Sequence, residues 1–151
     1  MIAEPRTLPG QVRTWAEALA PQAVVDVTPI GGGITNTKWL LRLTGGDALV
    51  LRWADPLVWR AIGRERVRRE AHACQLLAGS ALPVPRLVAC DLDGANAGGP
   101  ANLMTWRPGR VRLERLGPAA ITALARLAVA VHREPVFGGG PATDLLIPRA
   151  G

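Results

Sequence analysis

The chain has 151 residues, of which 48% are apolar, so it is long enough for one domain with a real core and short for a two-lobed enzyme. The formal charge is +6, and Lys38 is the one lysine among 18 basic residues. A basic balance favours anionic ligands such as nucleotides, although nucleic acid and membrane surfaces fit it too.

Targeting and redox signals are weak in this sequence. Charged residues and prolines interrupt the first 25 positions, and no apolar run approaches the ~20 residues that span a bilayer. Cys74 and Cys90 lie in apolar stretches without the spacing of a metal site, so we expect two reduced core thiols. We therefore expect a cytoplasmic protein with no membrane partner.

The first third of the chain predicts one helix followed by three antiparallel strands. Apolar residues at helical spacing and a closing Pro21 predict the helix, over 11–20. The strands are predicted over 24–30, 38–44 and 48–53. A glycine run, Gly31 to Gly33, opens a turn between the first two strands, and Gly45-Gly46 predicts a two-residue hairpin between the others.

A second helix is predicted over 60–77, and one of its faces is informative. At about 100° per residue, one arc gathers Val67, Ala71, Cys74, Leu77 and Ala78. Glu70 falls inside this arc, where a lone carboxylate needs a cationic partner. That partner could be Arg66, one helical turn away, or a cation from another element. The arginines of this helix predict a solvated face rather than a nucleic-acid patch, because no aromatic residues lie between them.

The rest of the chain predicts two more strands and a last helix. Leu82 to Pro85 is an extended connector. The strands are predicted over 86–90 and 102–105, with a turn-rich segment, 91–100, between them. Trp106 to Gly109 then indicates a hinge. The helix over 118–132 is apolar on nearly every side, which is typical of a buried helix, and the tail from Glu134 is rich in Gly and Pro.

This order of elements resembles the nucleotide-binding small lobe of the protein-kinase-like fold, and its motifs resemble those of the aminoglycoside phosphotransferase family. The matching motifs run from about residue 10 to 133: Ile30-Gly-Gly-Gly-Ile-Thr-Asn36, Leu49-Val-Leu-Arg52, Arg69-Glu70-Ala71, Pro83-Val-Pro85, Leu103-Met-Thr-Trp-Arg-Pro-Gly109 and Leu124-Ala-Arg-Leu-Ala128. The resemblance implies an α+β fold, with a five-stranded antiparallel sheet, one main helix, an N-terminal helix and the first large-lobe helix. It also implies a small lobe over 1–105, a hinge over 106–110 and the start of an incomplete large lobe over 111–151.

The resemblance also assigns nucleotide-binding roles. ATP would be the co-substrate, and a small-molecule hydroxyl the phosphate acceptor. Arg52 would hold the phosphates at a position that is often lysine in kinases, and Glu70 would pair with Arg52. Met104 would lie behind the adenine. The phosphates would be covered by Gly32, Gly33, Ile34, Thr35 and Asn36, and the adenine edge would meet the backbone of Thr105, Trp106 and Arg107.

Phosphoryl transfer in this family needs a His-Gly-Asp loop and a later aspartate that binds magnesium. Neither His72 nor His132 begins such a loop. The segment Asp91-Leu-Asp-Gly-Ala-Asn96 has turn composition and no upstream histidine, so a metal role there is rejected. We therefore expect a truncated phosphotransferase that is inactive alone, lacks catalytic and magnesium-binding residues, and self-associates through its last helix. The alternatives are a non-catalytic kinase-like interaction module and, less favoured, a nucleic-acid binder.

Overall fold

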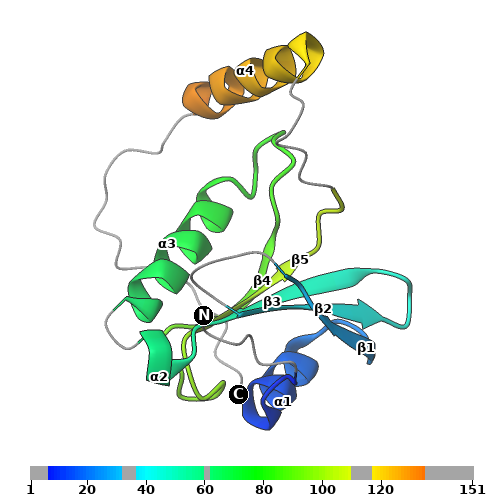
Figure 1. Ribbon diagram of the computed structural model, residues 1–151, viewed down its shortest axis with the longest axis vertical. Helices are drawn as coiled ribbons and strands as arrows, with labels where there is room; N and C mark the ends of the chain where they lie inside the picture. The colour runs from blue at the N-terminus through cyan, green and yellow to red at the C-terminus, as the bar shows by residue number, and fades with distance from the viewer. Residues whose placement is uncertain (1–6, 32–36, 60–61, 110–116, 135–151) are drawn as a thin grey trace.

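The computed structural model describes residues 7–31, 37–59, 62–109 and 117–134, and within them the chain forms an antiparallel five-stranded sheet with helices on both faces (Figure 1). The strand order is β1-β2-β3-β5-β4, so β5 lies between β3 and β4. The strands are β1 (Val24–Pro29), β2 (Thr37–Leu43), β3 (Ala48–Trp53), β4 (Leu87–Asp91) and β5 (Ala101–Thr105). All five predicted strands are therefore present.

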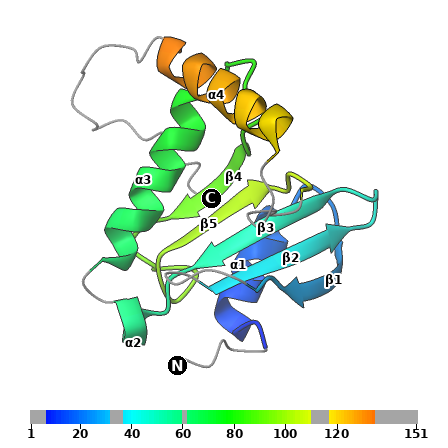
Figure 2. The same cartoon turned by 45° about the horizontal axis from the view of Figure 1, so that its top comes forward.

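One face of the sheet is covered by α1 (Gly10–Leu19), which lies behind the sheet in Figure 2. Its buried residues Val12, Trp15 and Ala16 share the main core with the alternate residues of the strands. Because side chains alternate along a strand, β2 and β3 give this core their odd-numbered positions: Trp39, Leu41, Leu43, Leu49, Leu51 and Trp53. The even-numbered positions of both strands therefore face the opposite side, where α3 packs.

The opposite face carries α3 (Gly63–Leu76), which packs on β4 and β5. Val67, Ala71 and Cys74 are buried on the predicted arc, and Val67 and Ala71 form a smaller core with Cys90. The helix was predicted to begin at residue 60, but it begins at Gly63. A separate short helix, α2 (Pro56–Trp59), precedes it, because the Asp55 carboxylate accepts a hydrogen bond from the Leu57 amide at 2.8 Å and a proline follows the cap.

The β2–β3 hairpin also differs from its prediction, since its loop has three residues rather than two. Gly46 N–H donates to Leu43 O at 3.0 Å, and Leu43 N–H donates to Asp47 O at 2.9 Å. Gly46 has a φ of 89°, which is a left-handed conformation that glycine adopts without a Cβ penalty. This pattern is a turn followed by a glycine bulge, the usual three-residue hairpin.

The segment between β4 and β5 is a tight turn organised by Asp91. The Asp91 Oδ2 atom accepts hydrogen bonds from the amides of Asn96 and Ala97, at 2.8 and 2.7 Å. Gly94 turns the chain with a φ of 71°. The Asp-to-Asn spacing of this segment is therefore that of a side-chain-stabilised turn, as its composition predicted.

The last described helix is α4 (Pro118–Arg133), and none of its residues is buried. Ile121, Leu124 and Val129 are about half exposed, at 55%, 53% and 47%. The expectation of a buried helix is thus not met within the described residues, because no other described element covers the apolar surface. Among the described helices, none is long and apolar enough to cross a membrane.

Candidate nucleotide-binding site

A mostly apolar cleft of about 410 Å³ lies on the α3 side of the sheet. Its floor comes from even-numbered strand positions such as Val50 and Arg52, and one wall comes from Glu70 and Cys74 of α3. The lining also includes Met104 to Arg107, which overlap the start of the predicted hinge at 106–110 and are called the hinge segment below. A volume and lining of this kind are typical of a small-molecule site.

Arg52 and Glu70 form an ion pair that bridges β3 and α3. The Arg52 Nη1 atom donates to Glu70 Oε1, and the two side chains are only 29% and 21% exposed. Strand alternation places Arg52 on this face, and the helical arc turns Glu70 toward it. The inward carboxylate thus has a cationic partner from another element, rather than only a neighbour along its own helix.

The second carboxylate oxygen of Glu70 is also bound. Asn102 of β5 donates from Nδ2 to Glu70 Oε2 at 3.0 Å, and the same nitrogen donates to the backbone oxygen of Val67 at 2.9 Å. Arg52 and Asn102 are register partners across β3 and β5. Three adjacent elements therefore converge on one carboxylate. Asn102 was not among the predicted site residues, and the one sequence signal for it is a polar residue within an apolar strand.

Two sulfur atoms form the inner wall of the cleft. The Cys74 Sγ atom lies 3.7 Å from Met104 Sδ, and both residues are buried. Burial raises the pKa of the Cys74 thiol, and the Glu70 carboxylate raises it further, while Arg52 acts in the opposite direction. The thiol is therefore held neutral in a soft, polarizable wall that suits a flat apolar ring.

The hinge segment is tied to the connector that precedes β4. Thr105 N–H donates to Arg86 O at 2.9 Å, and Thr105 Oγ1 accepts from the Arg86 amide at 2.9 Å. Trp106 N–H donates to Ala48 O at 3.0 Å. The amides of Thr105 and Trp106 are therefore engaged within the fold. Of the contacts predicted between this segment and the adenine edge, those made by its backbone carbonyl groups and by Arg107 therefore remain.

Cationic side chains outnumber carboxylates around the cleft. Lys38, Arg52 and Arg107 line it, against Glu70 alone. Lys38 is the register partner of Arg52 on β2, a juxtaposition that the sequence analysis missed because it depends on the register set by the three-residue hairpin loop. The excess of positive charge suits an anionic ligand. The predicted phosphate-covering residues Gly32 to Asn36 lie outside the described residues.

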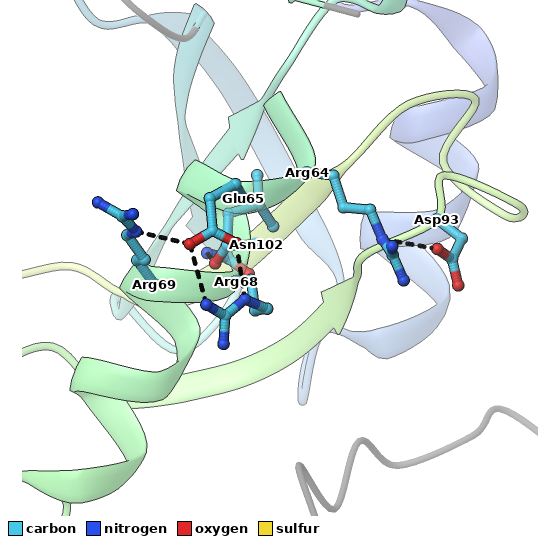
Figure 3. Close-up of polar contacts among 7 residues, drawn as sticks. Arg64, Glu65, Arg68, Arg69, Asp93 and Asn102 are labelled. Atoms are coloured by element: carbon cyan, nitrogen blue, oxygen red, sulfur yellow. Dashed lines mark hydrogen bonds and ion pairs between the residues drawn. The ribbon is translucent and has the colours of Figure 1, made fainter. Parts of the chain in front are cut away.

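Four other charged residues of α3, Arg64, Glu65, Arg68 and Arg69, form ion pairs apart from the cleft (Figure 3). Glu65 lies between Arg68 and Arg69, at 2.8 and 2.6 Å, and Arg64 pairs with Asp93 at 2.9 Å. Hydrogen bonds from Arg68 and Arg69 lower the pKa of Glu65 to about 2. These four side chains thus have partners at the surface, three of them within α3 and Arg64 with Asp93 of the β4–β5 turn, as expected for a solvated face.

Other candidate sites are less well equipped. Within the described ranges, no group of three or more His, Cys, Asp or Glu side chains could hold a metal ion. A larger groove of about 800 Å³ runs beside the β2–β3 hairpin, with Arg42 and Arg86 on its walls. Asp47 is its one carboxylate, and no ion pair joins that carboxylate to these arginines. The smaller cleft is therefore the better candidate.

Known proteins resemble this chain in sequence and in structure. The sequence model of the family described as "Phosphotransferase enzyme family" matches residues 26–149. No curated protein sequence matches the chain significantly.

Two solved structures share its fold. A protein from Ralstonia eutropha JMP134, provisionally named an aminoglycoside phosphotransferase, aligns with a TM-score of 0.54 and 24% identity, over 81% of this chain and 37% of that one. Aminoglycoside phosphotransferase APH(4)-Ia aligns with a TM-score of 0.52 and 19% identity, over 74% of this chain and 36% of that one. The 151 residues thus correspond to little more than a third of each solved relative, and they have the same α+β, kinase-like fold.

Proposed function

Because the chain belongs to the phosphotransferase enzyme family, we propose that the cleft between β3, α3 and the hinge segment binds ATP. The observation that carries this proposal is the Arg52–Glu70 pair at the wall of an apolar cleft. A cation held by an inward carboxylate beside a flat apolar slot is what a nucleotide needs, with charge for the phosphates and dispersion contacts for the base.

Arg52 would hold the phosphates. Glu70 takes one of its five N–H donors, and the side chain keeps 29% of its surface exposed. Glu70 acts on the ligand through Arg52, because its two oxygens are already bound within the protein. The residues 32–36 would add backbone donors from the glycine turn that joins β1 to β2.

The base would lie between Val50 on the floor and the Cys74–Met104 wall. Its polar edge would meet the hinge segment, where Arg107 and the carbonyl groups are the candidates. This assignment makes residues 1–105 the nucleotide lobe, 106–110 the hinge and 111–151 the start of a second lobe.

The transfer step is proposed for the whole family protein, with the hydroxyl group of a small molecule such as an aminoglycoside as the acceptor. The family uses magnesium, and within the described residues no group of three or more His, Cys, Asp or Glu side chains could hold a metal ion. Neither histidine of the chain begins a His-Gly-Asp sequence. The 151 residues alone are thus proposed to bind nucleotide without transferring phosphate, and turnover of a hydroxyl substrate by them would contradict this.

The binding proposal is tested by calorimetric titration of ATP into wild type, Arg52→Met and Arg42→Met. Methionine keeps the apolar stem and removes one charged phosphate contact, so Arg52→Met should weaken binding about tenfold or more. Arg42 is a β2 arginine outside the cleft, 60% exposed, and its variant should bind like wild type. Equal affinity in all three proteins would remove Arg52 from the site.

The exposed apolar surface of α4 supports a second proposal, self-association. Ile121, Leu124, Leu127 and Val131 are each more than 40% exposed. A contiguous apolar surface of this kind drives association in water. Light scattering should show the mass rising with concentration for wild type, and much less for Leu124→Lys. A monomeric wild type at all concentrations would contradict the proposal.

A further inference from the structure

Asn102 is fully buried in the middle of the sheet, at 0% exposure, and it is joined to the helix above it. It projects from β5 toward α3 (Figure 3). Its Nδ2 atom donates to Val67 O at 2.9 Å and to Glu70 Oε2 at 3.0 Å. Both partners are acceptors, so the orientation of the amide is fixed by chemistry, because the flipped amide would place oxygen against oxygen.

The side-chain oxygen of Asn102 lowers the folding stability of the core. The Asn102 Oδ1 atom is buried and has no hydrogen-bond partner. A buried polar atom without a partner costs free energy, and an apolar side chain of similar shape would avoid that cost. Val67 O also lies within a continuous helix, where a backbone N–H is its ordinary partner. Stability of the core alone therefore does not account for an asparagine here.

The geometry accounts for it through Glu70. An unsupported glutamate can rotate about its side-chain bonds, so that a single bond to Arg52 would not fix both groups. Here one carboxylate oxygen is bound to Arg52 and the other to Asn102, which is the register partner of that same arginine. The bond to Val67 O holds the preceding turn of α3 at the same point. The carboxylate thus has one orientation relative to the sheet.

We infer that Asn102 is a positioning residue for the nucleotide site, which fixes the Glu70 carboxylate and, through it, the Arg52 guanidinium. The inference deepens the proposed ATP-binding function and rests on it. Asn102 touches no ligand, since it does not line the cleft. Its effect on binding must therefore pass through α3, and a variant that already lacks the Glu70 carboxylate separates the route through Glu70 from a purely structural role through Val67.

The test is a double-mutant cycle on ATP affinity with Asn102→Leu, Glu70→Gln and the double variant. We expect Asn102→Leu to weaken ATP binding about fivefold, the coupling usual within one hydrogen-bond network, and the double variant to bind no more weakly than Glu70→Gln alone. A structural role would instead add its loss on either background. Unchanged affinity in Asn102→Leu, or losses that multiply in the double variant, would overturn the inference.

Two controls keep folding apart from positioning. Asn96→Leu changes an exposed asparagine of the β4–β5 turn and should leave ATP affinity as in wild type. Asn102→Leu should stay folded, with a urea midpoint lowered no more than that of Glu70→Gln, since the leucine removes the unpaired oxygen while leaving one Glu70 oxygen without its donor. If it does not fold, Asn102→Ser, which keeps a small donor, replaces it in the cycle and should fall between wild type and Glu70→Gln.

A nucleotide-free readout separates this inference from the proposed function. In ¹⁵N spectra of arginine side chains, the Arg52 guanidinium should give a slowly exchanging signal that Glu70→Gln removes. Asn102→Leu should shift or broaden that signal. If wild type binds no ATP while Asn102→Leu alters the signal, the proposed function fails and the positioning role stands. An unaltered signal in Asn102→Leu overturns the positioning role, whatever the affinity for ATP.

Discussion

The most informative perturbation is Glu70→Gln, which keeps the shape of the side chain and removes its charge. Glu70 accepts from Arg52 Nη1 and from Asn102 Nδ2, with Arg52 and Glu70 29% and 21% exposed. A hydrogen bond to a charged group contributes about 1.5–3 kcal/mol, and partial exposure lowers this. We expect a loss of about 2 kcal/mol in the free energy of unfolding, or ~4–8 °C in Tm for a domain of this size.

The assay is urea unfolding followed by tryptophan fluorescence, since Trp39 and Trp53 lie in the main core. The dependence on urea should keep its slope, which shows that the same surface unfolds. Glu65→Gln is the matched control on the same helix, because Glu65 pairs with Arg68 and Arg69 through side chains that are all more than a third exposed, and it should cost much less stability than Glu70→Gln. Equal losses in the two variants would refute the claim that the Arg52–Glu70 pair organises the fold.

Three further predictions concern charge, thiols and core. The pKa of Glu65 is lowered to about 2 by Arg68 and Arg69, so the small contribution of these solvent-screened pairs is full above pH ~4.5 and is lost as pH falls toward 2; acid titration of Glu65→Gln should lack this small part of the slope. Iodoacetamide should modify Cys74 before Cys90, because burial raises the pKa of the Cys90 thiol to about 12. ATP should slow only the reaction of Cys74, which lines the cleft, and mass spectrometry of the modified sites checks both expectations. Leu103→Ala empties a fully buried position and should cost about 2–5 kcal/mol in urea unfolding.

The charge pair could be predicted because both partners follow simple periodicities. Strand alternation determines the face of Arg52, and a 100° helical repeat turns Glu70 inward. The direction in which each of these two side chains points thus follows from the residues near it in the sequence. The short helix α2 was predictable in the same way, since Asp55 followed by proline is a helix-start signal, but the predicted helix over 60–77 did not include it.

What could not be predicted depends on contacts between distant segments. The insertion of β5 between β3 and β4 leaves no periodic trace, because strand partners are chosen by tertiary packing. The role of Asn102 follows from that insertion, since only the pairing of β5 with β3 brings it beside Arg52. The exposure of α4 was misjudged for a related reason: periodicity shows an apolar surface, and not whether another element covers it.

The central claim, that ATP binds in the cleft between β3, α3 and the hinge segment, is tested most directly by methyl NMR of the protein titrated with a non-hydrolysable ATP analogue. The account predicts that the largest shifts fall on Val50, Leu77 and Met104, which line the cleft. Shifts confined to Leu43 and Val88, beside the larger hairpin groove, would contradict it.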